Sequence, residues 1–131
     1  MNPKRVLVAD DEAAILNVVS YKLRKAGLEV IAAHDGRQAL ALAKSECPDL
    51  LIIDYQMPGL NGLEVCLQLR TEPRTVQIPA IMLTARGMDL DQDDLKRAGI
   101  SLLMAKPFSP REVLSCAQKL LSAEPAGQPC S

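Results

Sequence analysis

Hydrophobic residues are grouped along the chain in two ways, as short continuous runs and as longer stretches with helical spacing. The short runs predict five strands, because uninterrupted apolar residues are typical of strands buried on both faces of a sheet. The predicted strands are residues 5–9, 29–33, 49–54, 78–83 and 101–105. The clearest signal is the third, in which Leu50-Leu51-Ile52-Ile53 forms an unbroken apolar centre before Asp54.

A stretch with helical spacing follows each predicted strand. Apolar residues recur there every three or four positions, as expected of a helix with one buried face. The stretches are residues 15–26, 39–43, 63–69, 89–98 and 113–121, of which the fourth is acidic and has the thinnest apolar stripe. Gly27 lies where the C-cap of the first helix would be. Capping pairs open the third and last helices, and these are Asn61 with Glu64 and Ser109 with Glu112.

Strict alternation of strand and helix predicts one α/β domain, with a parallel sheet covered by helices on both faces. Residues 1–123 form this predicted domain. Residues 124–131 lack a core-forming pattern, and we expect a flexible tail or the start of a linker there. Right-handed crossovers bring the carboxyl ends of the strands to one edge of such a sheet, and its chemistry lies outside that edge.

Composition and charge bear on which kinds of partner the protein binds and on the cellular compartment in which it works. A formal net charge of -1 argues against a nucleic-acid or membrane surface as the main partner. No apolar stretch approaches the roughly 20 residues that span a bilayer, and no signal peptide opens the sequence. The four cysteines lack metal-ligand spacing, so free thiols are expected. Together these features predict a cytoplasmic protein.

Polar residues stand at the carboxyl ends of four predicted strands. They are Asp10 and Asp11 after the first, Asp54 at the third, Thr84 at the fourth and Lys106 at the fifth. Carboxylates gathered at one edge repel one another and demand a counter-charge, which a hard cation such as Mg²⁺ supplies through oxygen ligands. A carboxylate beside Mg²⁺, with an ammonium and a hydroxyl nearby, suits phosphoryl transfer, and the carboxylate can itself be the nucleophile.

Four motifs lie at these strand ends, in the order V-A-D-D-E, D-Y-Q-M-P-G-L-N-G, M-L-T-A and K-P-F. In residues and spacing they resemble the receiver domains of two-component response regulators, and the chain is similar to the chemotaxis response regulator. The resemblance covers residues 4–121. It implies a flavodoxin-like, doubly wound (βα)5 three-layer sandwich with parallel strand order 2-1-3-4-5.

The resemblance also implies a role for each polar residue. Asp54 would accept the phosphoryl group, and Thr84 and Lys106 would contact its oxygens. The implied Mg²⁺ ligands are Asp11 and Asp54, the backbone carbonyl of Gln56, and Asp10 through water. A cis peptide at Lys106-Pro107 would aim the lysine into the site.

Function follows from the resemblance as a set of expectations. A sensor histidine kinase or a histidine phosphotransfer domain would donate the phosphoryl group to Asp54. Phosphorylation would then change the face built from the helix at 89–98, the strand at 101–105 and the last helix, and with it the contact to a downstream protein. A second copy of the domain is a further partner to expect, in a dimer that forms on phosphorylation. The domain would phosphorylate and dephosphorylate itself without turning over an external substrate.

Two departures from the family pattern bear on this reading. Leu103 stands where the family usually has an aromatic residue whose rotation accompanies switching, and Gln56 and Arg86 occupy the variable sites flanking the phosphoryl group. The first departure keeps open a second interpretation, a receiver-like binding module that works without phosphorylation. An aspartyl phosphatase would need a second aspartate where Gln56 stands. A flavin carrier would need a phosphate-cradling loop where the acidic run begins at Asp10.

Overall fold

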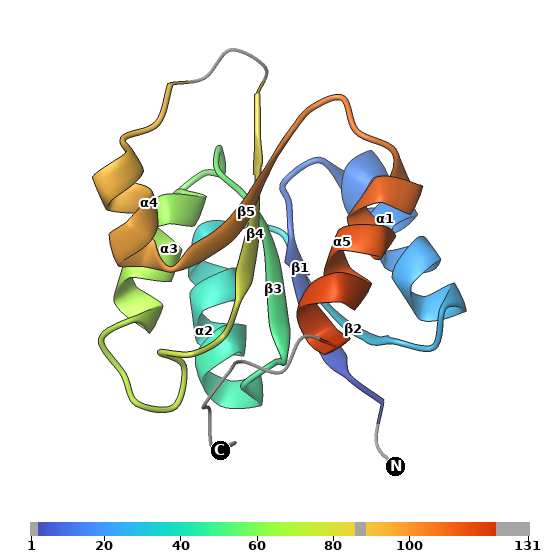
Figure 1. Cartoon of the computed structure of the whole chain (residues 1–131), viewed down its shortest axis with the longest axis horizontal. Helices are drawn as coiled ribbons and strands as arrows, with labels where there is room; N and C mark the ends of the chain where they lie inside the picture. The colour runs from blue at the N-terminus through green and yellow to red at the C-terminus, as the bar shows by residue number, and fades with distance from the viewer. Residues whose placement is uncertain (1–2, 86–88, 123–131) are drawn as a thin grey trace.

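The computed structural model describes residues 3–85 and 89–122. Five parallel strands form one sheet in the order β2-β1-β3-β4-β5, which confirms the predicted strand order (Figure 1). The strands are β1 Arg5–Ala9, β2 Glu29–Ala33, β3 Leu50–Asp54, β4 Ala80–Thr84 and β5 Ile100–Ala105. The predicted three-layer sandwich is therefore the observed fold.

Five helices among the described residues cover the two faces of the sheet. They are α1 Ala13–Lys25, α2 Gly36–Glu46, α3 Gly62–Leu69, α4 Gln92–Ala98 and α5 Pro110–Ser122. α1 and α5 lie together on one face, and α2, α3 and α4 lie side by side on the other (Figure 1). Within the described ranges, none of these helices has the length and apolar character that crossing a membrane requires.

The core is divided by the sheet into two hydrophobic clusters. Successive side chains of a strand point to opposite faces, so Leu51 and Ile53 join the cluster under α2 and α3. Leu50 and Ile52 join the cluster under α1 and α5. All five residues of β3 are buried, as its continuous apolar run predicts. The two edge strands are less covered: β2 is buried only at its last residue, and the middle residues of β5 are exposed.

The helices α3, α4 and α5 begin where a side chain caps the first backbone N–H groups. The two predicted capping boxes are confirmed, since Asn61 pairs reciprocally with Glu64 and Ser109 with Glu112. α4 begins later than the predicted residue 89, because the Asp91 side chain accepts hydrogen bonds from the backbone N–H groups of Asp93 and Asp94. Those bonds end the preceding loop and open the helix at Gln92.

Gly62, the first residue of α3, brings that helix against the end of β3. A Cβ atom at this position would lie only 2.5 Å from the Asp54 backbone oxygen. The Gly62 N–H also donates to the Tyr55 carbonyl oxygen at 2.9 Å. A glycine is needed here because the loop from β3 returns so closely on its own strand. The turn thereby fixes the backbone on which Asp54 sits.

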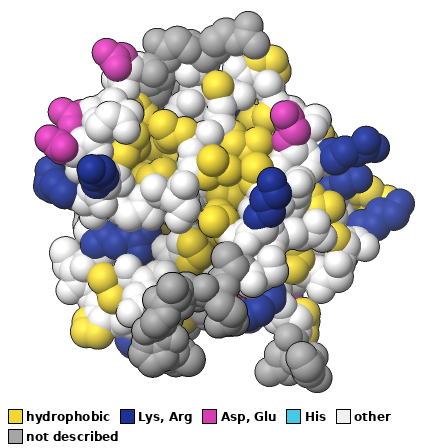
Figure 2. Space-filling model, in the orientation of Figure 1, with side chains coloured by type: hydrophobic (Ala, Val, Ile, Leu, Met, Phe, Trp, Pro, Cys, Tyr) yellow, Lys and Arg dark blue, Asp and Glu magenta, His cyan; other side chains and the backbone are white. Residues whose placement is uncertain are grey.

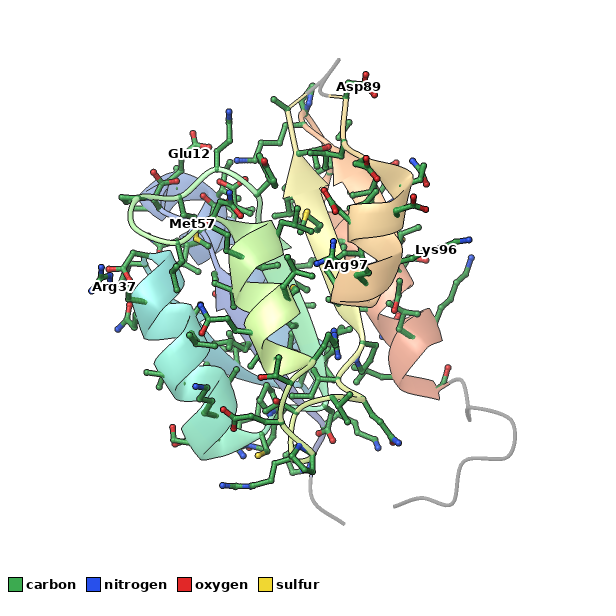
Figure 3. All side chains as sticks on the ribbon, turned by 90° about the vertical axis from the view of Figure 1, so that its left-hand side faces the viewer. Glu12, Arg37, Met57, Asp89, Lys96 and Arg97 are labelled. Carbon is green, nitrogen blue, oxygen red and sulfur yellow. The ribbon has the colours of Figure 1, made fainter. Side chains whose placement is uncertain are left out.

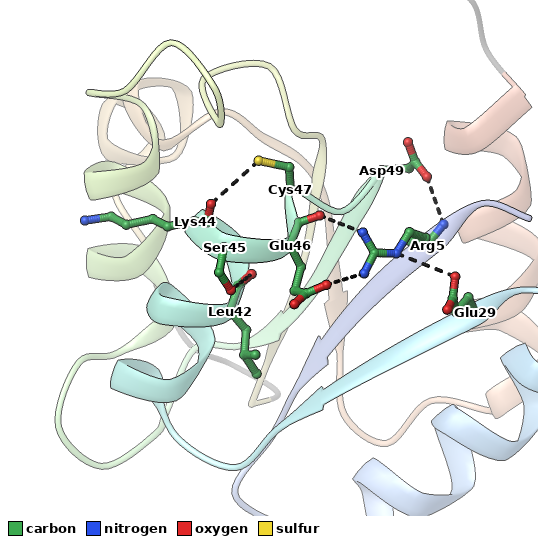
Figure 4. A network of polar contacts seen from close by, with 8 residues as sticks. All are labelled: Arg5, Glu29, Leu42, Lys44, Ser45, Glu46, Cys47 and Asp49. Atoms are coloured by element: carbon green, nitrogen blue, oxygen red, sulfur yellow. Dashed lines mark hydrogen bonds and ion pairs between the residues drawn. The ribbon is translucent and has the colours of Figure 1, made fainter. Parts of the chain in front are cut away.

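Arg5 fastens the opposite end of the sheet (Figure 4). Its guanidinium donates to the Glu46 backbone oxygen at 2.7 Å and pairs with the Glu46 carboxylate. Nε lies 3.5 Å from Glu29 Oε1, and the Arg5 backbone N–H donates to the Asp49 carboxylate at 2.8 Å. Arg5 thus links β1 to β2 and to the end of α2, far along the strands from the polar carboxyl ends.

Arg70, just after α3, ties three segments together through backbone carbonyl oxygens. Its Nε donates to Ala98 at 2.6 Å, Nη1 to Val76 at 2.7 Å and Nη2 to Ile78 at 2.7 Å. These acceptors belong to the end of α4 and to the loop that leads into β4. The side chain is partly buried, so its loss would leave carbonyl groups without their partners.

We expect Arg70→Met to lower the free energy of unfolding by about 2–3 kcal/mol, the size associated with unpaired partly buried polar groups. Urea denaturation followed by circular dichroism measures this change. Arg74→Met is the matched control, because Arg74 is exposed in the same loop region. Equal stability of the two variants would contradict the structural role given to Arg70.

Candidate functional site

The carboxyl ends of β1, β3, β4 and β5 place four polar side chains at one edge of the sheet. Asp10 follows β1, Asp54 and Thr84 are the last residues of β3 and β4, and Lys106 follows β5. The register aligns them, since Asp54 pairs with Leu83 and Thr84 pairs with the last residue of β5. The predicted convergence of strand ends is therefore present for these four residues. Asp10, Asp54 and Thr84 are all buried.

Lys106 is the centre of this edge. Its Nζ lies 2.8 Å from Glu12 Oε1, 3.3 Å from Asp54 Oδ2 and 3.6 Å from Asp10 Oδ2. Its backbone N–H donates to the Thr84 carbonyl oxygen at 2.7 Å, which holds the residue beside the end of β4. The Lys106-Pro107 peptide bond is cis, as predicted. One ammonium thus faces three carboxylates, Asp54 at the end of β3 and Asp10 and Glu12 in the loop after β1.

Asp54 and Asp10 hold their protons more tightly than an ordinary aspartate, because the pKa of each is raised. Burial first, and then the negative charge of Asp10, raise the pKa of Asp54 to about 6 against the opposing effect of Lys106. The pKa of Asp10 is also raised, first by burial, although a hydrogen bond from the Glu12 backbone and the Lys106 charge oppose the shift. Crowded, partly desolvated carboxylates of this kind favour a cation.

Lys106 itself remains a cation. Burial lowers its pKa, but the hydrogen bond to Glu12 and the charges of Asp10 and Asp54 outweigh burial and leave the pKa raised. Its side chain is 21% exposed, so the ammonium is reachable from the surface while three acids surround it. A fixed positive charge in this position can neutralise an anion that arrives beside Asp54.

An oxygen site for a metal ion lies next to the lysine. Asp10, Glu12 and Asp54 each offer a carboxylate oxygen, and these oxygens lie within 4.8 Å of one another. Asp10 Oδ2 is buried and lacks a hydrogen-bond partner among the described residues. An all-oxygen donor set that includes a buried carboxylate oxygen without a hydrogen bond fits a hard cation such as Mg²⁺.

The predicted metal ligands are brought together only in part. Asp10 and Asp54 belong to the cluster, whereas Asp11 is exposed and its carboxylate is not in the group. Gln56 is exposed in the loop after β3, and a hydrogen bond from its backbone lowers the pKa of Asp54. A metal-binding role for Asp11 and for the Gln56 carbonyl stays a prediction.

Glu12 is the member of the cluster that the sequence analysis did not single out as a site residue. It was quoted in the V-A-D-D-E motif, and its place one residue beyond the paired aspartates was the available signal. Its carboxylate makes the shortest contact with Lys106. Of the two variable positions named from the sequence, Gln56 is exposed in the loop after β3, and Arg86 lies outside the described residues.

Three comparisons with known proteins bear on this geometry. The family model for the response regulator receiver domain matches residues 6–118. The chain belongs to the response regulator receiver family. Receiver domains are signalling switches of two-component systems and are not enzymes that turn over a substrate. The predicted resemblance is therefore confirmed.

This receiver domain has curated relatives and structural neighbours. It is 40% identical over 128 residues to the alkaline phosphatase synthesis transcriptional regulatory protein PhoP of Bacillus subtilis, a match covering 98% of this chain and 52% of PhoP. The chain thus spans about half the length of that relative. The chemotaxis response regulator CheY4 of Vibrio cholerae superposes with a TM-score of 0.83 at 34% identity, covering 91% of this chain and 99% of CheY4.

A further neighbour concerns the metal. The receiver domain of the sensor histidine kinase PA1611 from Pseudomonas aeruginosa superposes with a TM-score of 0.83 at 26% identity, covering 93% of this chain and all of that one. That structure has a magnesium ion coordinated in its active-site cleft. Receiver domains bind Mg²⁺ at an acidic cluster, and among the described residues Asp10, Glu12 and Asp54 form an acidic group compatible with such a site.

Proposed function

We propose that this receiver domain accepts a phosphoryl group on Asp54 in a Mg²⁺-dependent reaction and so switches its contact with a partner protein. The observation that carries the proposal is the convergence on Lys106, whose ammonium lies within 3.6 Å of Asp54, Asp10 and Glu12. A buried carboxylate with a raised pKa beside a fixed cation is typical of a reactive site rather than of a surface turn.

The chemistry follows from the positions of the two groups. A carboxylate oxygen of Asp54 attacks the phosphorus of the donor, and the bond from phosphorus to the donor's leaving atom breaks, with its electron pair going to that atom. Lys106 compensates the charge of the transferred phosphoryl oxygens, and Thr84, at the end of the neighbouring strand, is placed to donate its hydroxyl to them. The acidic group that includes Asp10 and Asp54 would hold Mg²⁺, and the bound ion would add positive charge to the site.

The phosphodonor reaches Asp54 from the loop side of the sheet. A hollow beside the acidic cluster is lined by Glu12 and Ile15 of the first loop and helix, and by Lys106, Pro107 and Phe108 after β5. It continues along α1, where the exposed hydrophobic side chains of the described residues include Val18 and Tyr21. We infer that a sensor histidine kinase or a histidine phosphotransfer domain docks over this hollow to present its phosphohistidine.

The face formed by α4, β5 and α5 is the surface that contacts the downstream partner. β5 is an edge strand, and its Leu102 and Leu103 are 36% and 40% exposed. Figure 2 shows hydrophobic side chains gathered in the middle of this view, where Figure 1 draws β5. The backbone of Lys106 continues directly from β5, so a change at the site is transmitted to this strand. We propose that a downstream protein, or a second copy of the phosphorylated domain, binds here.

The proposal also covers the cellular compartment of the domain and the kind of partner that it contacts. We propose that the domain works in the cytoplasm. We also propose that it contacts neither nucleic acid nor membrane, because its net charge is -1 and α4 opens with acidic residues. Its target is then a protein that recognises the two states of α4, β5 and α5.

Amide hydrogen exchange tests the switching part of the proposal. With Mg²⁺ and beryllofluoride, a phosphoryl mimic, we expect altered exchange in α4 and β5 as well as in the loops around Asp54. Asp54→Asn under the same conditions is the control and should show no change. If exchange changes only in the loops at the site, the phosphorylation-independent binding module that Leu103 keeps open becomes the better description.

A further inference from the structure

Glu12 occupies an N-cap position but does not cap. It precedes α1 with extended backbone angles, and its side chain makes no capping hydrogen bond. Its backbone N–H instead donates to Asp10 Oδ1 at 2.8 Å, and its backbone oxygen accepts the N–H of Leu16. An acidic side chain at a helix start gains from the N–H groups and from the helix dipole there. Here the carboxylate turns across the edge of the sheet to Lys106.

The contact joins residues 94 positions apart in the sequence, with a Glu12 Oε1 to Lys106 Nζ distance of 2.8 Å. It is shorter than the contacts of Lys106 with Asp54 and Asp10. In Figure 3 Glu12 lies at the same end of the molecule as Met57, which belongs to the loop after β3. This is the edge of the sheet at which β3 ends with Asp54. The shortest ion pair of Lys106, the residue predicted to contact the phosphoryl group, is therefore with Glu12, an acid that was not among the predicted site residues.

We propose that Glu12 is a positioning residue that holds Lys106 in the resting state and competes with the phosphoryl group for its ammonium. This inference rests on the proposed phosphorylation of Asp54. On phosphorylation, Lys106 must turn one of its donors toward a phosphoryl oxygen, and the pair with Glu12 is the one that gives way.

Exposure decides which pair breaks. Once phosphorylated, Asp54 is no longer a free carboxylate, so Asp10 and Glu12 are the two acids left to pair with Lys106. The Glu12 side chain is 57% exposed, whereas that of Asp10 is 0% exposed. A released Glu12 carboxylate is taken up by water at small cost, because an exposed ion pair contributes little net free energy. A buried acid that lost its cation would be left unpaired at much higher cost. Glu12 can therefore act as a replaceable partner of the Lys106 ammonium, which a phosphoryl oxygen displaces.

The competition predicts that removing the Glu12 charge strengthens the phosphorylated state. At saturating Mg²⁺, we expect Glu12→Gln to bind beryllofluoride about twofold to fivefold more tightly than the unaltered protein, the range set by one exposed ion pair. NMR titration of backbone amides gives both dissociation constants. Asp89→Asn is the control, since Asp89 is an exposed acid at the same end of the molecule and its loss changes the net charge equally (Figure 3).

A double-mutant cycle separates competition for the lysine from simple charge repulsion. In a Lys106→Met background, the gain from Glu12→Gln should shrink to the level of the Asp89→Asn control. Unchanged or weaker binding by Glu12→Gln would overturn the proposal, and so would a gain that survives in full without Lys106. If the unaltered protein binds no beryllofluoride, the proposed function itself fails. The two failures are therefore distinguishable.

Discussion

Lys106→Met is expected to slow phosphorylation of Asp54 by acetyl phosphate about 100-fold, the loss associated with one preorganised donor in a transition state. Two effects act in the same direction. The variant lacks the ammonium that compensates the phosphoryl oxygens. It also lacks the charge that opposes the rise in the pKa of Asp54, so less of the nucleophile is ionised at neutral pH.

Initial rates of phosphate incorporation at saturating Mg²⁺ measure this loss. Lys96→Met is the control, because Lys96 is exposed on α4 and points away from the site (Figure 3). Circular dichroism checks that both variants are folded. A Lys106→Met rate within threefold of the control would contradict the central position given to this lysine.

Asp54→Asn is expected to stabilise the domain at neutral pH in the absence of Mg²⁺, although it removes the acceptor. Burial and the nearby Asp10 raise the pKa of Asp54 from its usual 3.8 to about 6. A shift of that size corresponds to about 3 kcal/mol of cost to the ionised form in the folded state. An asparagine carries no charge and avoids that cost, so about 3 kcal/mol is the upper limit of the gain.

The pH dependence of this gain identifies its cause. A folded-state pKa above the unfolded value means that the folded protein binds the proton more tightly between about pH 4 and pH 6. The cost is therefore fully present above pH 6 and disappears as the pH falls toward 4. The free-energy difference between Asp54→Asn and the unaltered protein should follow that course in urea unfolding with a chelator present, and adding Mg²⁺ should reduce it. A pH-independent difference would argue against electrostatic strain at Asp54.

The fold was predictable because its signals are local and repeated. Continuous apolar runs such as that of β3 mark strands buried on both faces, and the capping pair of Asn61 and Glu64 marks a helix start. Strand ends then place Asp54 and Lys106 on one edge by topology alone. Boundaries were less certain: β4 begins at Ala80 rather than at residue 78, because the ladder with β3 starts there.

The remainder depends on contacts between distant parts of the chain. Nothing near Glu12 in the sequence indicates that its side chain turns from the helix start to Lys106, a residue 94 positions away. Arg70 likewise reads as an ordinary charge at the end of a helix, although its donors bind carbonyl oxygens after α3 and at the end of α4. Cys47 has a left-handed backbone with a φ of 44°, a conformation that a glycine or asparagine would have signalled.

The most direct test of the account is the intact mass of the protein after incubation with acetyl phosphate and Mg²⁺. The account predicts a gain of one phosphoryl group that is lost with EDTA and absent from Asp54→Asn. Asp49→Asn, which alters an exposed acid at the opposite end of β3, should retain the gain. If the unaltered protein gains no mass, or if Asp54→Asn gains as much, the assignment of Asp54 as the phosphoryl acceptor is contradicted.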